Sequence, residues 1–364
     1  MITNIKKTGD KGLFLFKFAN MLPMKKAFLL FLLAAGISCT GHQSIEDVSV
    51  RVLSSTFIYD SDTIPSCHAS TLVESGGGLL AAWFGGSYES HPDVGIYCSR
   101  YDGSVWSQPA QVADGIQSDS LRYPCWNPVL FRMENGCIVL FYKVGPNPRE
   151  WWGEYRLSAD EGLSWGESVP LPAGMLGPIK NKPLAMPDGR ILYPTSVEYT
   201  TDNWKVFVES SEKDLSDWKI TPIDNNGFNA IQPTFFLCGR KLEMLCRTQE
   251  GVLASASSED FGRSWTPLQG TDLPNNNSGI DGIVLKDGLR LLVCNPIQEG
   301  RNKLALLGSY DGHHWRTLLL LEDQPSGEFS YPAIIPLHDG TIGITYTYNR
   351  KRIKFVSLAV LDER

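Results

Sequence analysis

The chain has 364 residues, of which 42% are hydrophobic and 20% are charged, and its formal net charge is −7. This composition is typical of a globular protein with a large core and excludes a disordered or fibrous chain. The acidic balance argues against nucleic acid as a partner, because binding to phosphates requires a basic surface. The 34 glycines and 22 prolines favour short strands joined by tight turns over long helices.

The N-terminal segment is typical of an export signal. Residues 24–39 read MKKAFLLFLLAAGISC, with two lysines, an apolar run too short to span a membrane, small residues and a cysteine. The segment resembles a bacterial lipoprotein signal, which implies lipidation of Cys39; secretion with cleavage nearby is the alternative. We expect a signal region at 1–40, a linker at 41–47 and an exported protein, in the periplasm or anchored at the cell surface by lipid alone.

The remaining cysteines follow no metal-ligand spacing, and most lie in apolar, strand-like runs. Export would permit disulfides, but an odd number leaves at least one free thiol. We interpret them as buried free thiols, and the sequence predicts neither a metal nor a cofactor. They are Cys67, Cys98, Cys125, Cys137, Cys238, Cys246 and Cys294.

One unit recurs six times along the chain: an apolar strand, a tight turn with glycine, and a second apolar strand. Examples are VLFRMENGCIVLFY at 129–142 and IIPLHDGTIGITYT at 334–347. Asn-Gly and Asp-Gly between such strands are strong signals for a β-hairpin. The turn glycines recur about every 50 residues. They are Gly78, Gly136, Gly189, Gly239, Gly288 and Gly340.

A second motif, Ser-x-Asp-x-Gly-x-x-Trp, lies between successive hairpins. Residues 157–165 (LSADEGLSW) and 257–265 (SSEDFGRSW) match it fully. Its Asp and Ser can accept hydrogen bonds from turn amides, its Gly can take a positive φ, and its Trp can pack between sheets. We interpret these tryptophan turns as architecture rather than ligand sites. Looser copies occupy 98–106, 210–218 and 308–315.

A period near 50 residues with about four short strands per unit predicts a β-propeller, and six hairpins predict six blades. The last hairpin is followed by only one clear strand, at 352–361. Residues 48–60 can supply the missing strand and close the ring, which would otherwise keep an open edge. The sequence therefore predicts an all-β, six-bladed propeller over residues 48–364, and we expect a monomer.

The innermost strands of a propeller line its axis, so their first residues should converge at one mouth of the ring. Polar residues indeed begin these apolar strands, as in CHAST at 67–71, CWNPV at 125–129 and AIQPT at 230–234. The ends of the second strands and the starts of the third strands should join them. The candidate set is His68, Asp93, Trp126, Asn127, Lys143, Lys180, Asn181, Lys182, Glu198, Gln232, Arg247, Asp281, Asn295, Arg301 and Tyr331.

Several of these residues are cationic although the protein is acidic. Gathering cations at one mouth costs self-repulsion that an anionic ligand would relieve. Two arginines can hold a carboxylate through bidentate hydrogen bonds, and tryptophan can stack on a sugar. The sequence therefore predicts an acidic oligosaccharide or glycoconjugate as ligand. The predicted binding residues are Arg247, Arg301, Lys143, Lys182, Asn127, Trp126, Gln232 and Asp281.

The tryptophan turns are similar to the Asp-boxes of the sialidase (neuraminidase) superfamily, and the resemblance covers roughly residues 60–360. It implies a sugar carboxylate held by three arginines, a tyrosine nucleophile activated by a glutamate, and an aspartate as acid and base. Arg247 and Arg301 match the second and third arginines, Tyr331 matches the nucleophile, and Asp93 lies near the position of the acid. The resemblance thus implies an exo-acting hydrolase of a terminal acidic sugar.

Two departures bring this resemblance closest to the divergent sialidase-like proteins of glycan-degrading bacteria. His68 stands where the family has its first arginine, in an Arg-Ile-Pro motif. Gln232 stands where the family has the activating glutamate, and glutamine cannot accept a proton. Glu198 or Glu328 could serve as the base instead.

Two further functions stay open at this point. A uronate-cleaving lyase would use the cations to neutralise the carboxylate beside the proton that is removed, with His68 or Tyr331 as base and acid. This function would give His68 a role and would not require a glutamate in place of Gln232. A surface lectin would bind the glycan without turning it over.

Overall fold

The computed structural model describes residues 44–60 and 63–362. The predicted signal region and Cys39 lie outside the described residues. The first described element is a short 3₁₀ helix, η1 (Ile45–Asp47), whose N-cap Ser44 accepts a hydrogen bond from the amide of Glu46. Within the described ranges, no helix is long and apolar enough to cross a membrane.

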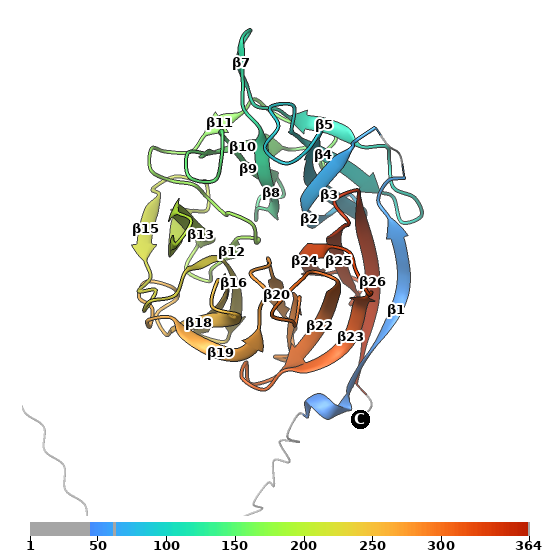
Figure 1. The fold of residues 1–364 in the computed structure, drawn as a ribbon, viewed down its shortest axis with the longest axis vertical. Coiled ribbons are helices and arrows are strands. Elements are labelled where there is room, and N and C mark those ends of the chain that lie inside the picture. The colour runs from blue at the N-terminus through green and yellow to red at the C-terminus, as the bar shows by residue number, and fades with distance from the viewer. Residues whose placement is uncertain (1–43, 61–62, 363–364) are drawn as a thin grey trace, which may run out of the picture. The chain divides into compact units, whose positions relative to one another are not determined.

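Six four-stranded antiparallel sheets form a closed ring around a central axis (Figure 1). The following bounds run from the axis outward. Blade one is β2 (Ser66–Ser75), β3 (Gly78–Gly86), β4 (Gly95–Tyr101) and β5 (Ala110–Ala113). Blade two is β8 (Cys125–Arg132), β9 (Ile138–Val144), β10 (Trp152–Ser158) and β11 (Val169–Pro170). Blade three is β12 (Leu184–Ala185), β13 (Arg190–Thr200), β14 (Asn203–Glu212) and β15 (Lys219–Pro222).

The second half of the chain repeats the same order. Blade four is β16 (Ala230–Cys238), β17 (Lys241–Thr248), β18 (Val252–Ser258) and β19 (Gln269–Pro274). Blade five is β20 (Asp281–Val284), β21 (Arg290–Cys294), β22 (Lys303–Ser309) and β23 (Arg316–Asp323). Blade six is β24 (Phe329–Pro336), β25 (Ile342–Tyr348), β26 (Arg352–Asp362) and β1 (Val48–Phe57).

Blade six closes the ring with strands from both ends of the propeller. Strand β1 pairs antiparallel with β26, from Val48 opposite Asp362 to Phe57 opposite Lys354. The pairing covers the edge of β26 that would otherwise stay open. The prediction of an all-β, six-bladed propeller closed by an N-terminal strand is confirmed.

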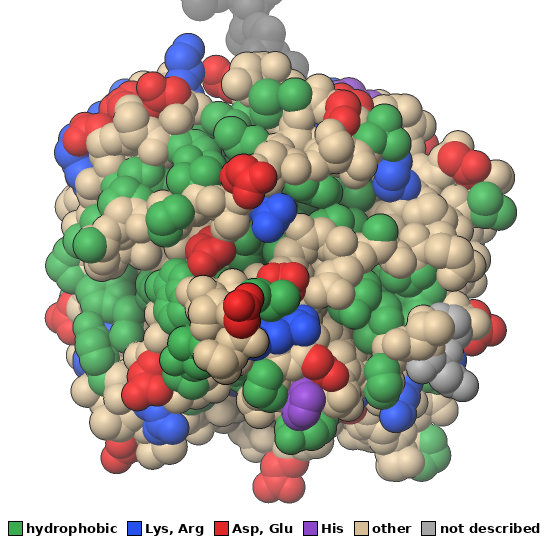
Figure 2. Space-filling model, turned by 90° about the horizontal axis from the view of Figure 1, so that it is seen from above, with side chains coloured by type: hydrophobic (Ala, Val, Ile, Leu, Met, Phe, Trp, Pro, Cys, Tyr) green, Lys and Arg blue, Asp and Glu red, His purple; other side chains and the backbone are tan. Residues whose placement is uncertain are grey.

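One hairpin, β6 (Ile116–Ser118) with β7 (Leu121–Arg122), projects from the rim between blades one and two (Figure 1). Figure 2 looks onto this side of the rim, where charged side chains are interspersed with hydrophobic ones. Ile116 and Leu121 in the hairpin are exposed.

The hydrophobic core is divided among the spaces between neighbouring blades. One cluster joins Leu80 and Ile96 of blade one to Leu130 and Leu140 of blade two. Equivalent clusters join the other blades, and each takes in partly buried aromatic side chains. Because burial between the sheets stabilises the ring, the residues at the axis are free to be polar.

The tryptophan turns have the architectural role predicted for them. In the turn after β18, Asp260 accepts hydrogen bonds from Ser258 Oγ and from the amides of Arg263 and Ser264, at 2.8, 3.0 and 2.9 Å. Gly262 has φ of 80°, and the ring of Trp265 stacks on Phe235 with centroids 5.9 Å apart. The turn therefore fixes the tryptophan in the core between blades three and four.

Two local predictions need correction. The turn of the first hairpin is formed by Gly76 and Gly77, with φ of 56° and 79°, whereas Gly78 begins β3. Three consecutive glycines leave the turn position undetermined by sequence. All seven cysteines after Cys39 are free, but Cys137 and Cys238 are only half-buried, because they lie beside the hairpin turns.

Candidate functional site

The innermost strands of four blades carry a β-bulge just inside the mouth, each at a register shift against the second strand. The bulged residues have positive φ: Ala69 (55°), Asn127 (33°), Gln232 (53°) and Tyr331 (52°). The last three precede proline, a position that normally favours extended backbone. Bulges redirect side chains, and strained backbone of this kind is concentrated at functional sites.

Two of these bulges place their side chains in one cluster at the mouth. Tyr331 Oη accepts a hydrogen bond from Nη1 of Arg247 at 2.6 Å, and the same Nη1 donates to Gln232 Oε1 at 3.1 Å. Gln232 Nε2 in turn donates to Tyr331 Oη at 3.4 Å. The tyrosine comes from blade six and the other two residues from blade four, so ring closure creates this cluster.

Arg247 is a buried cation with neutral partners. It is 7% exposed, its Nε donates to Asn277 Oδ1 at 2.9 Å, and its guanidinium lies over the ring of Trp204. Among the described residues, no carboxylate forms an ion pair with it. Removing a guanidinium from water is costly unless an anion compensates its charge, so this arrangement favours an anionic ligand.

A chain of ion pairs lies beside this cluster. Arg301 has its guanidinium carbon 5.9 Å from the ring centre of Tyr331, and its Nη1 donates to Glu328 Oε1 at 2.9 Å. The same oxygen accepts from Nε of Arg350 at 2.7 Å, and Arg350 Nη1 pairs with Glu89 Oε2 at 2.6 Å. Burial alone would raise the pKa of Glu328, but Arg350 and Arg301 lower it, so this carboxyl is ionised.

His68 completes the cluster as a neutral imidazole. Its ring lies 4.1 Å from that of Tyr331, and its Nδ1 is 2.9 Å from Thr347 Oγ1. Burial holds the pKa of His68 well below its usual 6.5, and the nearby Arg350 is the largest electrostatic contribution in the same direction. His68, Gln232, Arg247, Arg301 and Tyr331 thus meet at one site, as their sequence positions predict.

Lys182 and Asp281 also lie near the axis, but they pair with each other. Lys182 Nζ is 2.8 Å from both carboxylate oxygens of Asp281, which also accepts from Thr234 Oγ1 and the amide of Ile334. These bonds join the inner strands of blades four, five and six to blade three. Their contacts are those of a structural ion pair rather than of a free ligand-binding group.

Lys180 belongs to the same network. Its Nζ donates to Asn181 Oδ1 and to the carbonyl of Ile280, both at 2.9 Å, and to the carbonyl of Pro332. Burial lowers the pKa of Lys180 to about 7. These hydrogen bonds join the segment before blade three to blades five and six near the axis.

Two predicted binding residues do not face the mouth. Lys143 is fully buried, its Nζ donates to the carbonyl of Pro178 at 2.8 Å, and burial lowers its pKa to about 7. Trp126 is 5% exposed, donates from Nε1 to the carbonyl of Gly145 and packs against Trp151. Trp126 lies at the start of β8 and Lys143 near the end of β9, as their spacing predicts. The pleat of the strands directs both side chains into the packing between blades instead of into the mouth. Asn127 is buried beside them on its bulge.

The two predicted acid–base carboxylates are Glu198, near the end of β13, and Asp93, in the loop before β4. Burial raises the pKa of Glu198 and Arg247 opposes the shift, which places Glu198 within the electrostatic reach of the cluster. Asp93 accepts from the amide and hydroxyl of Ser87 at 3.0 and 2.6 Å. Although burial acts to raise the pKa of Asp93, the hydrogen bonds from Ser87 and His91 lower it. Asp93 and Glu89 share the loop between β3 and β4.

The sequence and fold of this chain can be compared with known proteins. Residues 77–344 match the BNR repeat-like domain. The chain belongs to this family. No functionally curated protein matches the sequence.

Solved structures similar to this BNR propeller include sialidases. A protein of unknown function from Dyadobacter fermentans DSM 18053 aligns with a TM-score of 0.70 and 15% identity, over 86% of this chain and 100% of that one. The NanB sialidase of Streptococcus pneumoniae aligns with a TM-score of 0.64 and 16% identity, over 84% and 70%. The intramolecular trans-sialidase of Ruminococcus gnavus aligns with a TM-score of 0.65 and 14% identity, over 85% and 97%. The BNR propeller therefore shares the sialidase fold.

Sequence reasoning missed Arg350, Glu89, Asn277 and Trp204. Arg350 could have been found, because it follows the second strand of blade six just as Arg247 ends the second strand of blade four. The other three lie in loops or third strands, where the repeat gives no spacing rule.

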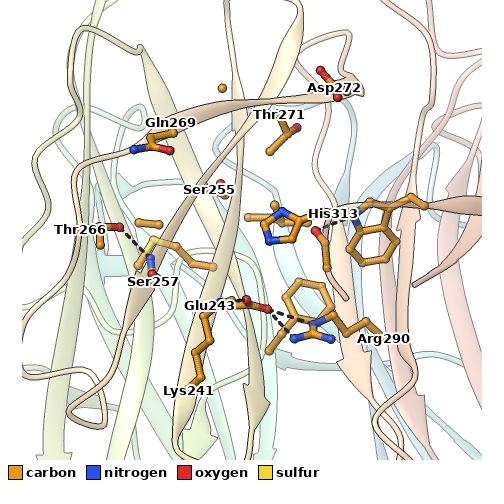
Figure 3. A pocket seen from close by; sticks show the side chains of 17 residues that line it. Lys241, Glu243, Ser255, Ser257, Thr266, Gln269, Thr271, Asp272, Arg290 and His313 are labelled. Carbon is orange, nitrogen blue, oxygen red and sulfur yellow. Dashed lines mark hydrogen bonds and ion pairs between the residues drawn. The ribbon is translucent and has the colours of Figure 1, made fainter. Parts of the chain in front are cut away.

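A separate groove of the BNR propeller lies between blades four and five (Figure 3). It is lined by Lys241, Glu243 and His313, and its base holds an ion pair between Glu243 and Arg290 at 2.8 Å. Trp315 of a tryptophan turn also lines it, so the groove belongs to the end of the ring opposite the mouth. Within the described ranges, no group of three His, Cys, Asp or Glu residues is arranged to hold a metal.

Proposed function

We propose that this BNR propeller is an exported exo-glycosidase that hydrolyses a terminal acidic sugar, either sialic or uronic acid, from glycans. The observation that carries the proposal is Arg247, a buried guanidinium bonded to Tyr331 Oη and lacking a carboxylate partner among the described residues. A sugar carboxylate would supply the missing anion. In sialic acid, which carries its carboxylate on the anomeric carbon, the same contact would place that carbon near the tyrosine.

The cluster supports a division of roles. Arg247 and Arg301 bind the carboxylate of the sugar, since both lie against the ring of Tyr331. Tyr331 attacks the anomeric carbon as the bond to the leaving oxygen breaks. A tyrosine suits this centre because a carboxylate nucleophile would be repelled by the acidic sugar. Water then releases the sugar from the tyrosine.

Proton transfer falls to Asp93 and Glu198. Asp93 protonates the leaving oxygen, which requires it to take up a proton once a glycan covers its loop, because its pKa is lowered in the free protein. Gln232 cannot take the proton of Tyr331. Glu198, whose pKa is raised by burial, is the candidate acceptor.

The test is a screen of the purified protein on sialyl- and uronate-terminated oligosaccharides, with free sugar and the ultraviolet absorbance of unsaturated sugars measured together. Hydrolysis releases free acidic sugar without new absorbance. Tyr331→Phe should lower turnover by roughly 10²-fold or more while keeping the ring contact with His68. Activity confined to neutral glycans would contradict the proposal.

A uronate lyase is the second candidate, favoured by one contact. The neutral imidazole of His68 lies 4.1 Å from the Tyr331 ring, and a neutral imidazole can accept a proton. In this reaction the cations stabilise the charge that develops on the uronate as its proton leaves. Unsaturated product in the same screen would identify the lyase, and binding without either product would identify a lectin.

A further inference from the structure

We propose that the groove between blades four and five is a second binding site, which takes a neutral sugar unit of a glycan. The groove lies at the end of the ring opposite the mouth, so it is separate from the cluster around Tyr331. Its volume is about 340 Å³, within the range of about 300–1,000 Å³ that is typical of small-molecule sites. The inference goes beyond the proposed function and depends on no activity at the mouth.

A single change in the repeat opens the groove. Each tryptophan turn begins at a buried serine, and the third-strand residue three positions before that serine faces the next blade. In blades one, two, three and five this residue is hydrophobic and packs in or against the core cluster between neighbouring blades. In blade four it is Ser255, whose short side chain cannot fill the space that a leucine fills in blade five. The four hydrophobic residues are Ile96, Tyr155, Val208 and Leu306, and the buried serines are Ser99, Ser158, Ser211, Ser258 and Ser309.

Blade four presents unengaged polar groups to the groove. Ser255 on β18 is the register partner of Gln269 on β19, so the two side chains lie on the same face of the sheet. Ser257, two residues along β18, shares that face. Within the described ranges, none of these three side chains has a hydrogen-bond partner. Hydroxyls and amides both donate and accept, which matches the hydroxyl groups of a sugar.

Blade five supplies an aromatic wall. Trp315 lines the groove and is held in place by a hydrogen bond from its Nε1 to the carbonyl of Gly312, at 3.0 Å. Its ring also packs against Phe236, with centroids 6.0 Å apart. A fixed ring gives the apolar C–H face of a sugar a surface to pack on, while the sugar hydroxyls meet the polar groups of blade four. Figure 3 shows those polar side chains, with His313 of blade five.

The charged side chains that line the groove compensate one another. Glu243 accepts from Nε of Arg290 at 3.0 Å, and its other oxygen lies 2.7 Å from Nζ of Lys241. Asp272 is the second carboxylate of the lining. Two cations and two carboxylates leave no net charge, so an uncharged ligand loses no water-solvated charge on binding. The groove therefore favours a neutral sugar, in contrast to the cationic cluster at the mouth.

The experiment is a ligand-observed NMR titration of the full chain with four neutral disaccharides: lactose, cellobiose, mannobiose and N,N′-diacetylchitobiose. At least one should bind with a Kd on the order of 1 mM or below. Ser255→Leu is the main variant, because it introduces the side chain that blade five carries at the equivalent position and fills the groove. It should weaken binding by at least about tenfold while the melting temperature stays equal or rises. Gln269→Ala should weaken binding roughly three- to tenfold, as expected for one lost hydrogen bond.

Ser118→Leu, the same substitution at an exposed position in the projecting hairpin, is the matched control and should bind like the wild type. If none of the four disaccharides binds, or if Ser255→Leu binds as tightly as the wild type, the inference is wrong. Hydrolysis of an acidic sugar at the mouth would still stand in either case. Should Ser255→Leu fail to fold, Gln269→Ala decides the same question, because Gln269 is exposed and its loss leaves the core intact.

Discussion

Tyr331 Oη and Arg247 Nη1 lie 2.6 Å apart, although 84 positions separate the two residues in the chain. The bond joins blades six and four at the mouth. It places a cationic donor on the one hydroxyl that the proposed reaction needs, since a charged donor stabilises negative charge on the oxygen it contacts. The third member of this cluster, Gln232, is the point at which the site differs from what a hydrolase with a tyrosine nucleophile requires.

Gln232→Glu tests whether the missing base limits catalysis. The new carboxylate would lie within hydrogen-bonding reach of both Tyr331 and Arg247. We expect hydrolysis to accelerate by roughly tenfold or more, because a positioned general base contributes about 10²–10⁴-fold. Gln249→Glu, the same change at an exposed position after β17, is the control and should leave kcat unchanged. A lower kcat with a higher KM would instead show that the new carboxylate competes with the substrate for Arg247.

His68→Gln tests the neutral state of the buried imidazole. The folded protein keeps the pKa of His68 well below 6.5, whereas the unfolded chain takes up a proton near that pH. Stability contributed by the neutral ring is therefore complete above pH 6.5 and is lost as the pH falls. At pH 5 the loss can reach at most about 2 kcal/mol, the limit set by 1.5 pH units at about 1.4 kcal/mol each.

Urea unfolding at pH 7.5 and pH 5 measures this effect. The wild type should lose more stability than His68→Gln between the two pH values, by up to about 2 kcal/mol. Other titrating groups are shared by the two proteins and cancel in the comparison. Equal losses would mean that His68 is protonated in the folded state.

Lys143→Met tests the buried amine between blades two and three. The pKa of Lys143 is lowered to about 7, while the unfolded chain keeps its proton up to pH 10.5. The wild type should therefore gain stability from pH 7 to pH 9, with about 1.4 kcal/mol per pH unit from each such lysine. The pKa of Lys180 is also lowered to about 7, so Lys143→Met should roughly halve the rise in unfolding free energy per pH unit. A thermal-unfolding series over this range measures it, and an unchanged slope would contradict the assignment.

Asp260→Ala tests the architectural role of the tryptophan turns. The carboxylate accepts hydrogen bonds from two backbone amides and two hydroxyls, so its loss should cost about 1–3 kcal/mol of unfolding free energy. Ligand binding should not change, because the turn lies at the end of the ring opposite the mouth. Glu259→Ala, at the exposed neighbouring position, should leave the melting temperature within about a degree. If Asp260→Ala lost ligand binding but kept its stability, the turn would be part of the ligand-binding site instead.

The sequence by itself determined the architecture. Hairpin turns and tryptophan turns depend on short-range chemistry, such as a glycine with positive φ or an aspartate accepting amides, and they recur with the period of the blade. The same period placed Tyr331, Arg247, Gln232 and His68 at one mouth, because ring closure brings equivalent strand ends together. The same expectation, that the end of each second strand lies at the mouth, would also have identified Arg350 in blade six.

Only the tertiary structure decided which side chains reach the site. The bulges at Gln232 and Tyr331 turn their side chains into one cluster, and a one-residue register shift of this kind leaves no periodic signal. Lys143 and Trp126 obey the same spacing, yet the pleat directs them into the packing between blades. The pairing of Arg350 with Glu89 and Glu328 joins segments from the beginning and the end of the ring, so it exists only once the ring has closed.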